Sequence, residues 1–111
     1  GFLAPVQGPP TVNIAKAGGA IPVKFSLGGD RGLNIFATGS PSSATVACTS
    51  GTPTGTVEAT ATAGNSGLSY DATSDTYSYI WKTDKAWANT CRRLTLRFVD
   101  GTVAEADFQF K

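Results

Sequence analysis

Apolar and polar residues alternate in steps of two along much of this chain, and this alternation restricts the possible fold more than any other feature. Ile21, Val23 and Phe25 alternate with Pro22 and Lys24, in a run that ends at a pair of glycines. Side chains point alternately to opposite faces of a β-strand, so the pattern is typical of a half-buried strand that ends in a turn. Gly, Pro, Ser and Thr interrupt every window long enough for an amphipathic helix. The sequence therefore predicts an all-β protein.

Two hairpins are expected in the second half of the chain. Tyr70 ends one strand, the polar segment 71–75 forms a turn, and an aromatic-rich strand returns from Thr76 to Lys82. In the second hairpin, alternating residues lead up to Asp100-Gly101 and away from it again. Asp-Gly between two alternating runs is a strong signal for a hairpin.

The remaining strands are shorter or less regular. A segment containing Val46 and Cys48 is expected to point these two side chains inward, and the alternation over 57–63 predicts an edge strand. Together these patterns predict about seven to eight short strands separated by turns, which favours a sandwich over a barrel. A chain of 111 residues has the length of one domain. We therefore expect residues 1–111 to form a single immunoglobulin-like antiparallel β-sandwich.

The only two cysteines, Cys48 and Cys91, lie far apart in sequence and in β-like segments. Without histidine they cannot form an ordinary structural zinc site, and they do not have the C-x-x-C spacing of a redox pair. We predict one disulfide, which by chain entropy contributes on the order of 4 kcal/mol. Such bridges persist in oxidising compartments, so an extracellular protein, secreted or at the cell surface, is expected. Two buried free thiols in a cytosolic protein remain the alternative.

The absence of histidine limits the chemistry of the chain. It excludes Ser-His-Asp and Cys-His catalysis and histidine-ligated metals. The carboxylates have simpler explanations as turn residues or outward-facing strand residues, and this applies to Asp71 and Asp75 and to Asp100 at its hairpin tip. A calcium site on the loops at 28–30 or 71–75 is less consistent with the sparse acidic ligands than solvated turns are. We therefore expect no enzyme activity, no catalytic residues, no metal site and no cofactor.

Charge and hydropathy limit the partners. Nine basic and eight acidic residues give a net charge of +1, and the basic residues are scattered except for Arg92, Arg93 and Arg97. Nucleic-acid binding needs a concentrated positive face, so no nucleic-acid partner is expected. No apolar run approaches the length of a membrane span, which argues against membrane insertion. Residues 2–6 are typical of a strand that enters from an upstream linker or domain, so we expect the chain to be an excised piece given without its signal peptide.

The aromatic residues allow two interpretations. Tyr77, Tyr79 and Trp81 share one face of a strand whose other face is mostly polar, so this aromatic face is expected to line the core. Trp81 is a candidate to pack on an inter-sheet disulfide, as in immunoglobulin domains. Trp87 lies in an irregular connection and is expected to pack in the core or loop. In the alternative, Trp87 forms an exposed sugar-stacking platform with Tyr77 or Tyr79. Alternation points Lys24 outward, against an isopeptide crosslink.

Several motifs along the whole chain resemble the PxKF domain family, which occurs at the C-terminal ends of secreted bacterial proteins. The motifs are Ala4-Pro5-Val6, Pro9-Pro10, Lys16-Ala17-Gly18, Ile21-Pro22-Val23-Lys24-Phe25-Ser26-Leu27-Gly28-Gly29, Gly67-Leu68-Ser69-Tyr70-Asp71, Trp81-Lys82-Thr83, Trp87, Thr90-Cys91-Arg92, Asp100-Gly101-Thr102 and Phe108-Gln109-Phe110. Asn89 replaces a glycine before Thr90-Cys91, which affects only the turn, since asparagine tolerates positive φ.

The resemblance implies an immunoglobulin-like fold, pairing of Cys48 with Cys91, and a natural chain end at or near Lys111. It also implies an accessory module appended to an exported protein, with no catalytic motif and no binding residue carried over. We therefore expect a monomeric, non-catalytic C-terminal module of a larger secreted protein, with the upstream domain of the same polypeptide as its neighbour. It would attach the protein to a cell surface or polymeric substrate, or act as a stabilising spacer. The alternative is a carbohydrate-binding module with an exposed aromatic platform.

Overall fold

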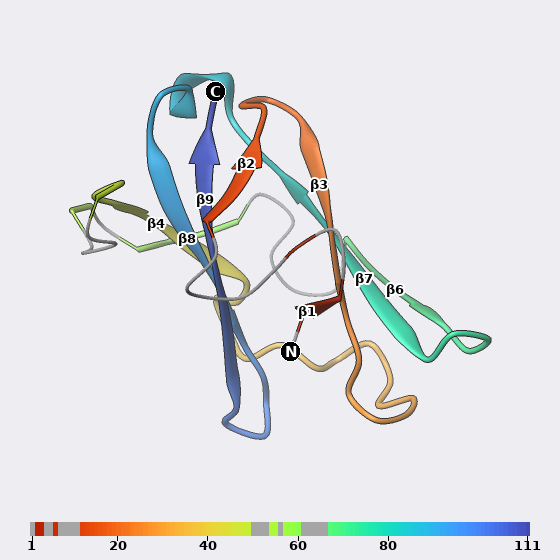
Figure 1. Ribbon diagram of the computed structural model, residues 1–111. Coiled ribbons are helices and arrows are strands. Elements are labelled where there is room, and N and C mark those ends of the chain that lie inside the picture. The colour runs from red at the N-terminus through yellow and green to blue at the C-terminus, as the bar shows by residue number, and fades with distance from the viewer. Residues whose placement is uncertain (1, 4–5, 7–11, 50–53, 56, 61–66) are drawn as a thin grey trace.

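The computed structural model describes residues 2–3, 6, 12–49, 54–55, 57–60 and 67–111, and within these ranges the chain forms two packed β-sheets (Figure 1). The predicted all-β sandwich is therefore confirmed. The described elements are β1 (Phe2–Leu3), β2 (Val12–Ala15), β3 (Ala20–Phe25), β4 (Ser42–Val46), β5 (Glu58–Ala59), β6 (Leu68–Asp71), β7 (Thr76–Lys82), η1 (Lys85–Trp87), β8 (Cys91–Arg97) and β9 (Val103–Phe110). In the described ranges no helix is long and apolar enough to cross a membrane.

The strand order is that of an immunoglobulin-like sandwich. One sheet has the order β1-β3-β7-β6 and the other has the order β2-β9-β8-β4-β5. These orders correspond to the A-B-E-D sheet and the G-F-C sheet of immunoglobulin domains, with β2 added beside G and β5 added beyond C. The expectation of a wholly antiparallel sandwich is wrong for one pair, because β2 runs parallel to β9. Strand β2 lies at the sheet edge, where its crossover from the other sheet sets its direction.

Alternation along the strands builds the core. In β7 the inward residues Tyr77, Tyr79 and Trp81 are fully buried, while Lys82 is exposed. The same period of two places Leu94 and Leu96 of β8 inside, because residues i and i+2 share one face of a strand. The core cluster comprises Val6, Ala17, Val23, Phe25, Ile35, Leu68, Tyr77, Tyr79, Trp81, Leu94, Leu96, Phe98, Ala106, Phe108 and Phe110.

The connections fall at two opposite ends of a body that measures 36 × 24 × 24 Å. The β3–β4 loop, the β6–β7 turn and the β8–β9 turn lie at one end, which we call the loop end (Figure 1). The β2–β3 turn, η1 and Lys111 lie at the other end. The predicted turn at Asp100-Gly101 is confirmed, with Gly101 at φ 92°, and Asn89 adopts the positive φ, 65°, expected of it.

Of two expectations for the middle of the chain, one needs correction and the other, an edge strand, is confirmed over two residues. Val46 is buried, but it lies outside the core cluster and shares a face with Cys91, its partner in the strand register, while Cys48 is exposed beyond the end of β4. Of the edge strand expected over 57–63, the structure forms Glu58–Ala59, and residues 61–63 lie outside the described ranges. The alternation was too weak to indicate which residues pair.

Candidate functional site

The two tyrosines proposed as part of a sugar platform lie inside the sandwich. Tyr77 and Tyr79 are each 0% exposed, so their assignment as ligand-binding residues is wrong, and the expectation that the aromatic face lines the core is confirmed. The Tyr77 hydroxyl accepts a hydrogen bond from the Arg31 N–H at 2.6 Å and donates one to the Gly32 carbonyl at 2.9 Å. The Tyr79 hydroxyl is hydrogen-bonded to the Thr60 hydroxyl. Both hydroxyls therefore hold connecting segments against the core.

Trp87 is half-buried in η1 and packs on the aromatic core. Its ring centroid lies 5.8 Å from that of Trp81 and 5.6 Å from that of Phe110. The Arg92 guanidinium carbon lies 3.9 Å from the centroid of the Trp87 ring, in the geometry of a cation–π contact. Because Arg92 occupies a ring face that a sugar would need, this arrangement favours the packing interpretation of Trp87.

The predicted disulfide between Cys48 and Cys91 is present, with a Cα–Cα distance of 5.2 Å. It joins the loop after β4 to the first residue of β8, and β4 and β8 are neighbouring strands of one sheet. The expected inter-sheet bridge beside Trp81 is therefore wrong. The ring neighbours of Trp81 are Trp87, Phe108 and Phe110 instead. Cys91 shares its strand face with Arg93, on the side of the sheet away from the core.

All six aspartates of the chain hold local structure. Four of them accept a hydrogen bond from the backbone N–H two residues further on, which is the geometry of an Asx turn. These bonds are Asp30 to Gly32 at 2.8 Å, and Asp71 to Thr73, Asp84 to Ala86 and Asp100 to Thr102 at 2.9 Å each. Asp75 accepts from the Tyr70 hydroxyl at 2.8 Å, and Asp107 pairs with Arg93 Nε at 2.7 Å.

These bonds bear directly on the candidate carboxylate chemistry. Asp71 and Asp75, the predicted turn residues, are engaged by the turn itself and by Tyr70. The hydrogen bond from Tyr70 to the Asp75 carboxylate raises the pKa of the Tyr70 phenol to about 12, so its proton stays on the donor. Among the residues that the structure describes, no three acidic or cysteine side chains gather in a way that could hold a metal ion.

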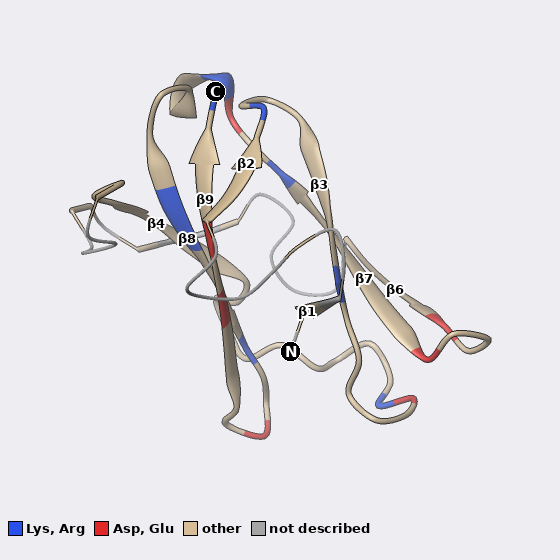
Figure 2. Cartoon of the chain, in the orientation of Figure 1, with Lys and Arg blue, Asp and Glu red and all other residues tan. Residues whose placement is uncertain are grey.

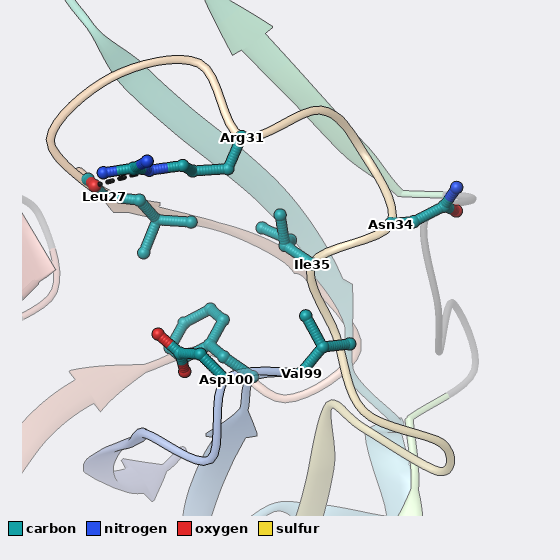
Figure 3. A pocket seen from close by; sticks show the side chains of 7 residues that line it. Leu27, Arg31, Asn34, Ile35, Val99 and Asp100 are labelled. Atoms are coloured by element: carbon teal, nitrogen blue, oxygen red, sulfur yellow. Dashed lines mark hydrogen bonds between the residues drawn. The ribbon is translucent and has the colours of Figure 1, made fainter.

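A pocket of about 430 Å³ opens at the loop end, between the β3–β4 loop and the β8–β9 turn (Figure 3). Leu27, Ile35 and Val99 supply apolar side chains around the opening, and Phe98 also lines the pocket. Arg31 extends along one wall and its Nε donates to the Leu27 carbonyl at 3.3 Å. The pocket has the size and mixed lining of a small-ligand site, and it lies where antibody domains carry two of their binding loops.

The rim of this pocket carries charges of both signs. The Thr102 hydroxyl donates to the Asp100 carboxylate at 2.6 Å, and this bond, with the Thr102 backbone N–H and the nearby charge of Arg31, lowers the pKa of Asp100. Asp100 therefore stays ionised opposite Arg31. Asn34 is the third polar lining residue, and in Figure 3 its side chain points away from the cavity.

The sequence by itself did not indicate this pocket. It predicted a turn after residue 27 and another at Asp100-Gly101, but no periodicity shows that two turns about seventy residues apart meet at one end of a sandwich. The available signal in the sequence was the presence of two apolar residues, Leu33 and Val99, in these turns. In the structure their side chains are 42% and 68% exposed. Apolar residues in otherwise polar turns are candidates for contacts with another molecule.

We compared the chain with family models, with curated protein sequences and with solved structures, and none of the three comparisons gives a match. The class of the protein is thus defined by its own fold and by the arrangement of its side chains. It is a disulfide-bonded, immunoglobulin-like β-sandwich with a pocket at its loop end.

Proposed function

We propose that this chain is a non-catalytic accessory module of a secreted bacterial protein, related to the PxKF domains. In this proposal it attaches the protein to a cell surface or polymeric substrate, or serves as a stabilising spacer, with the upstream domain of the same polypeptide as its neighbour. The disulfide supports an extracellular setting, because such bonds persist in oxidising compartments.

The observation that carries the proposal is the engagement of every aspartate in turns, hydrogen bonds or an ion pair. A carboxylate acid–base pair needs two carboxyls that face a common space, and carboxylates tied to neighbouring backbone N–H groups hold loops instead. With no histidine in the sequence, the described side chains offer no nucleophile with an adjacent base.

The placement of the two ends of the described chain supports the role of a spacer. Phe2 lies opposite Phe25, at the far end of β3, whereas Lys111 is hydrogen-bonded to Ala15 and Ala17, just before β3 begins. A strand rises about 3.3 Å per residue, so these two points are separated by roughly 20 Å along β3. A domain joined at the first point is thereby held away from whatever the opposite end contacts.

The test is a pull-down of the disulfide-bonded chain on chitin, on cellulose and on isolated bacterial cell wall. Retention on at least one polymer without release of soluble fragments supports attachment, whereas retention on none supports the spacer role. Release of soluble sugar by the purified chain contradicts a non-catalytic module.

Two variants in the same pull-down distinguish sugar stacking on Trp87 from a packing role of this residue. Trp87→Ala removes the ring, and Trp87→Leu keeps apolar volume beneath Arg92. Loss of retention in both variants, with unchanged thermal unfolding, would make Trp87 a sugar-contacting residue. If both variants are retained on the polymer, the role of Trp87 is packing.

A further inference from the structure

Four of the five lysines of the chain gather at the end of the sandwich opposite the loop end. Lys16 lies in the β2–β3 turn, Lys82 ends β7, Lys85 begins η1, and Lys111 follows β9. All four side chains are exposed, and Figure 2 shows Lys and Arg residues around this end. We call these four residues the basic end. The sequence-based description of the basic residues as scattered is wrong in three dimensions.

Backbone hydrogen bonds fix Lys16 and Lys111 side by side. The Lys111 N–H donates to the Ala15 carbonyl at 2.9 Å, and the Ala17 N–H donates to the Lys111 carbonyl at 3.1 Å. Lys111 is therefore bonded to the residues on both sides of Lys16. This pair of bonds continues the parallel pairing of β2 with β9 by one residue, so the two lysine side chains start from neighbouring positions of the sheet.

The other two lysines are held against the same turn. Ala20 lies opposite Lys82 in the strand register. The stem of Lys85 lies over Gly18, since a Cβ on that glycine would be 2.6 Å from Lys85 Cγ. Gly18 also has φ 88°, which other residues rarely adopt. The turn between β2 and β3 thus brings together lysines from four separate segments.

Among side chains, the basic end has little acidic compensation. Asp84 is the carboxylate next to Lys85, and its Oδ1 is occupied by the Ala86 N–H at 2.9 Å. Three other aspartates, Asp30, Asp75 and Asp100, lie in loops or turns at the loop end, and Asp71 ends β6 beside one of these turns. A chain with a net charge of only +1 therefore carries four of its five lysines at one end and four of its six aspartates at or next to the other.

The chemistry of the basic end favours a flexible polymer with repeated negative groups. A lysine ammonium is a compact point charge without the forked geometry of arginine, so it attracts phosphate or carboxylate without fixing one orientation. Single-stranded nucleic acid is bound mainly by bases that stack on exposed aromatic rings. The neighbouring ring, Trp87, is half-buried and has Arg92 over it, so that contribution is lacking here.

We propose that the basic end binds an anionic polysaccharide, in which phosphodiester or carboxylate groups contact Lys16, Lys82, Lys85 and Lys111. This inference rests on the proposed attachment function and names its substrate class. The charge polarity orients the domain with its lysines towards the polymer and its loop-end pocket away from it. Attachment and the pocket then operate at opposite ends of the molecule.

The test measures binding of the intact chain to labelled polygalacturonate, which carries carboxylates, and to a glycerol-phosphate polymer. Neutral dextran and duplex DNA are the comparison polymers. Raising the salt from about 50 to 200 mM is expected to weaken binding to the preferred polyanion by about 10- to 50-fold, if up to four charges are neutralised. The two anionic polymers distinguish carboxylate from phosphate recognition.

Two double variants with the same net charge separate the basic end from overall charge. Lys82→Gln with Lys85→Gln removes two charges at the basic end and keeps the Cγ that covers Gly18. Lys24→Gln with Arg97→Gln removes two exposed charges elsewhere. We expect about a tenfold loss of affinity at low salt for the first pair and less than about a twofold loss for the second.

The outcomes divide as follows. Equal losses in both double variants, or tighter binding to duplex DNA than to either polysaccharide, overturn the inference. Retention on chitin, cellulose or cell wall that neither salt nor the first pair changes also overturns it, but leaves the attachment function standing. If no polymer of any kind is bound, attachment itself fails and the spacer role remains.

Discussion

The two ends of this sandwich are closed in different ways. At the basic end, Trp81 contacts the rings of Phe108, Phe110 and Trp87 at centroid distances of 5.0, 5.7 and 5.8 Å. At the loop end, the β3–β4 loop and the β8–β9 turn leave a pocket of about 430 Å³ between them. Rings also pack towards the loop end, where the Phe98 ring lies 5.6 Å from that of Phe25 and 5.7 Å from that of Phe36, but the two connections there leave a pocket lined by apolar and charged side chains.

This difference predicts that the basic end contributes more to stability and that the loop end adjusts more easily to a ligand. Ring packing at the basic end buries large apolar areas, and backbone bonds such as Asn89 N–H to the Phe110 carbonyl at 2.9 Å tie the connections to β9. At the loop end, the Tyr77 hydroxyl bonds Arg31 and Gly32, and backbone bonds from the Val99 N–H to the Ile35 carbonyl at 2.9 Å and from the Ala37 N–H to the Arg97 carbonyl at 2.8 Å hold the rest of the loop. Residues 30–34 between these contacts are all exposed, and an exposed loop segment can adjust to a ligand without loss of the core.

The largest expected effect is the loss of a ring at the packed end. Trp81 is 0% exposed, so Trp81→Ala is expected to lower the free energy of unfolding by about 5 kcal/mol, the upper part of the range for aromatic-to-alanine changes. At the loop end, Val99 is 68% exposed, and Val99→Ala should change it by less than about 0.5 kcal/mol. Urea unfolding of both variants measures the contrast, and similar losses would show that the ends do not differ.

Reduction of the disulfide is expected to have the next largest effect. The bridge spans a sequence separation of 43 residues, for which chain entropy gives about 4 kcal/mol. The melting temperature should fall by roughly 15 °C in reductant. The Cys48→Ser/Cys91→Ser variant should start at the lower value and show no response to reductant. A melting temperature unchanged by reductant in the native chain would contradict both the estimate and the secreted setting.

Much of the fold was predictable because alternation reports directly which side of a strand is buried. The runs around Val23, Tyr79 and Leu96 were all assigned to strands, and all three residues are fully buried. Alternation fails where a strand has two covered faces. Val46 is buried on the face away from the core, beside the disulfide. Arg92, near the start of β8, points to the core side and lies over the Trp87 ring.

The candidate sites were less predictable, because they depend on contacts between distant segments. Tyr77 and Tyr79 could be assigned either to the core or to a surface from sequence alone, and packing between the sheets decides it. The gathering of Lys16 with Lys111 follows from the parallel pairing of β2 with β9, which no local pattern indicates. Pockets and charged patches of this kind need the topology first.

Tyr77→Phe tests whether one hydroxyl holds the loop end to the core. The variant keeps the buried ring but leaves the Arg31 N–H and the Gly32 carbonyl without this partner. An ordinary hydrogen bond contributes about 0.5–1.5 kcal/mol, and because two bonds are lost we expect a loss of about 2 kcal/mol. Amide exchange should accelerate in the β3–β4 loop and stay unchanged at Asn89 and Lys111. Equal acceleration at both ends would mean that the hydroxyl supports the whole sandwich.

The smallest expected effect is a pH dependence at the loop end. Tyr70 donates its hydroxyl proton to Asp75, and this bond raises the pKa of the phenol from about 10 to about 12 in the folded chain. Between these two values the unfolded chain releases the Tyr70 proton first, so unfolding becomes more favourable as the pH rises. The contribution of the bond is fully present below about pH 10 and is lost as the pH passes about 12. Tyr70→Phe should remove this part of the pH dependence, and a slope equal to that of the native chain would show that Asp75 does not hold the proton of Tyr70.

At the basic end, Lys16→Gln provides the control. It should leave the difference in pH dependence between the native chain and Tyr70→Phe unchanged. A shared alkaline response of both variants would instead attribute the slope to overall charge and erase the distinction between the two ends.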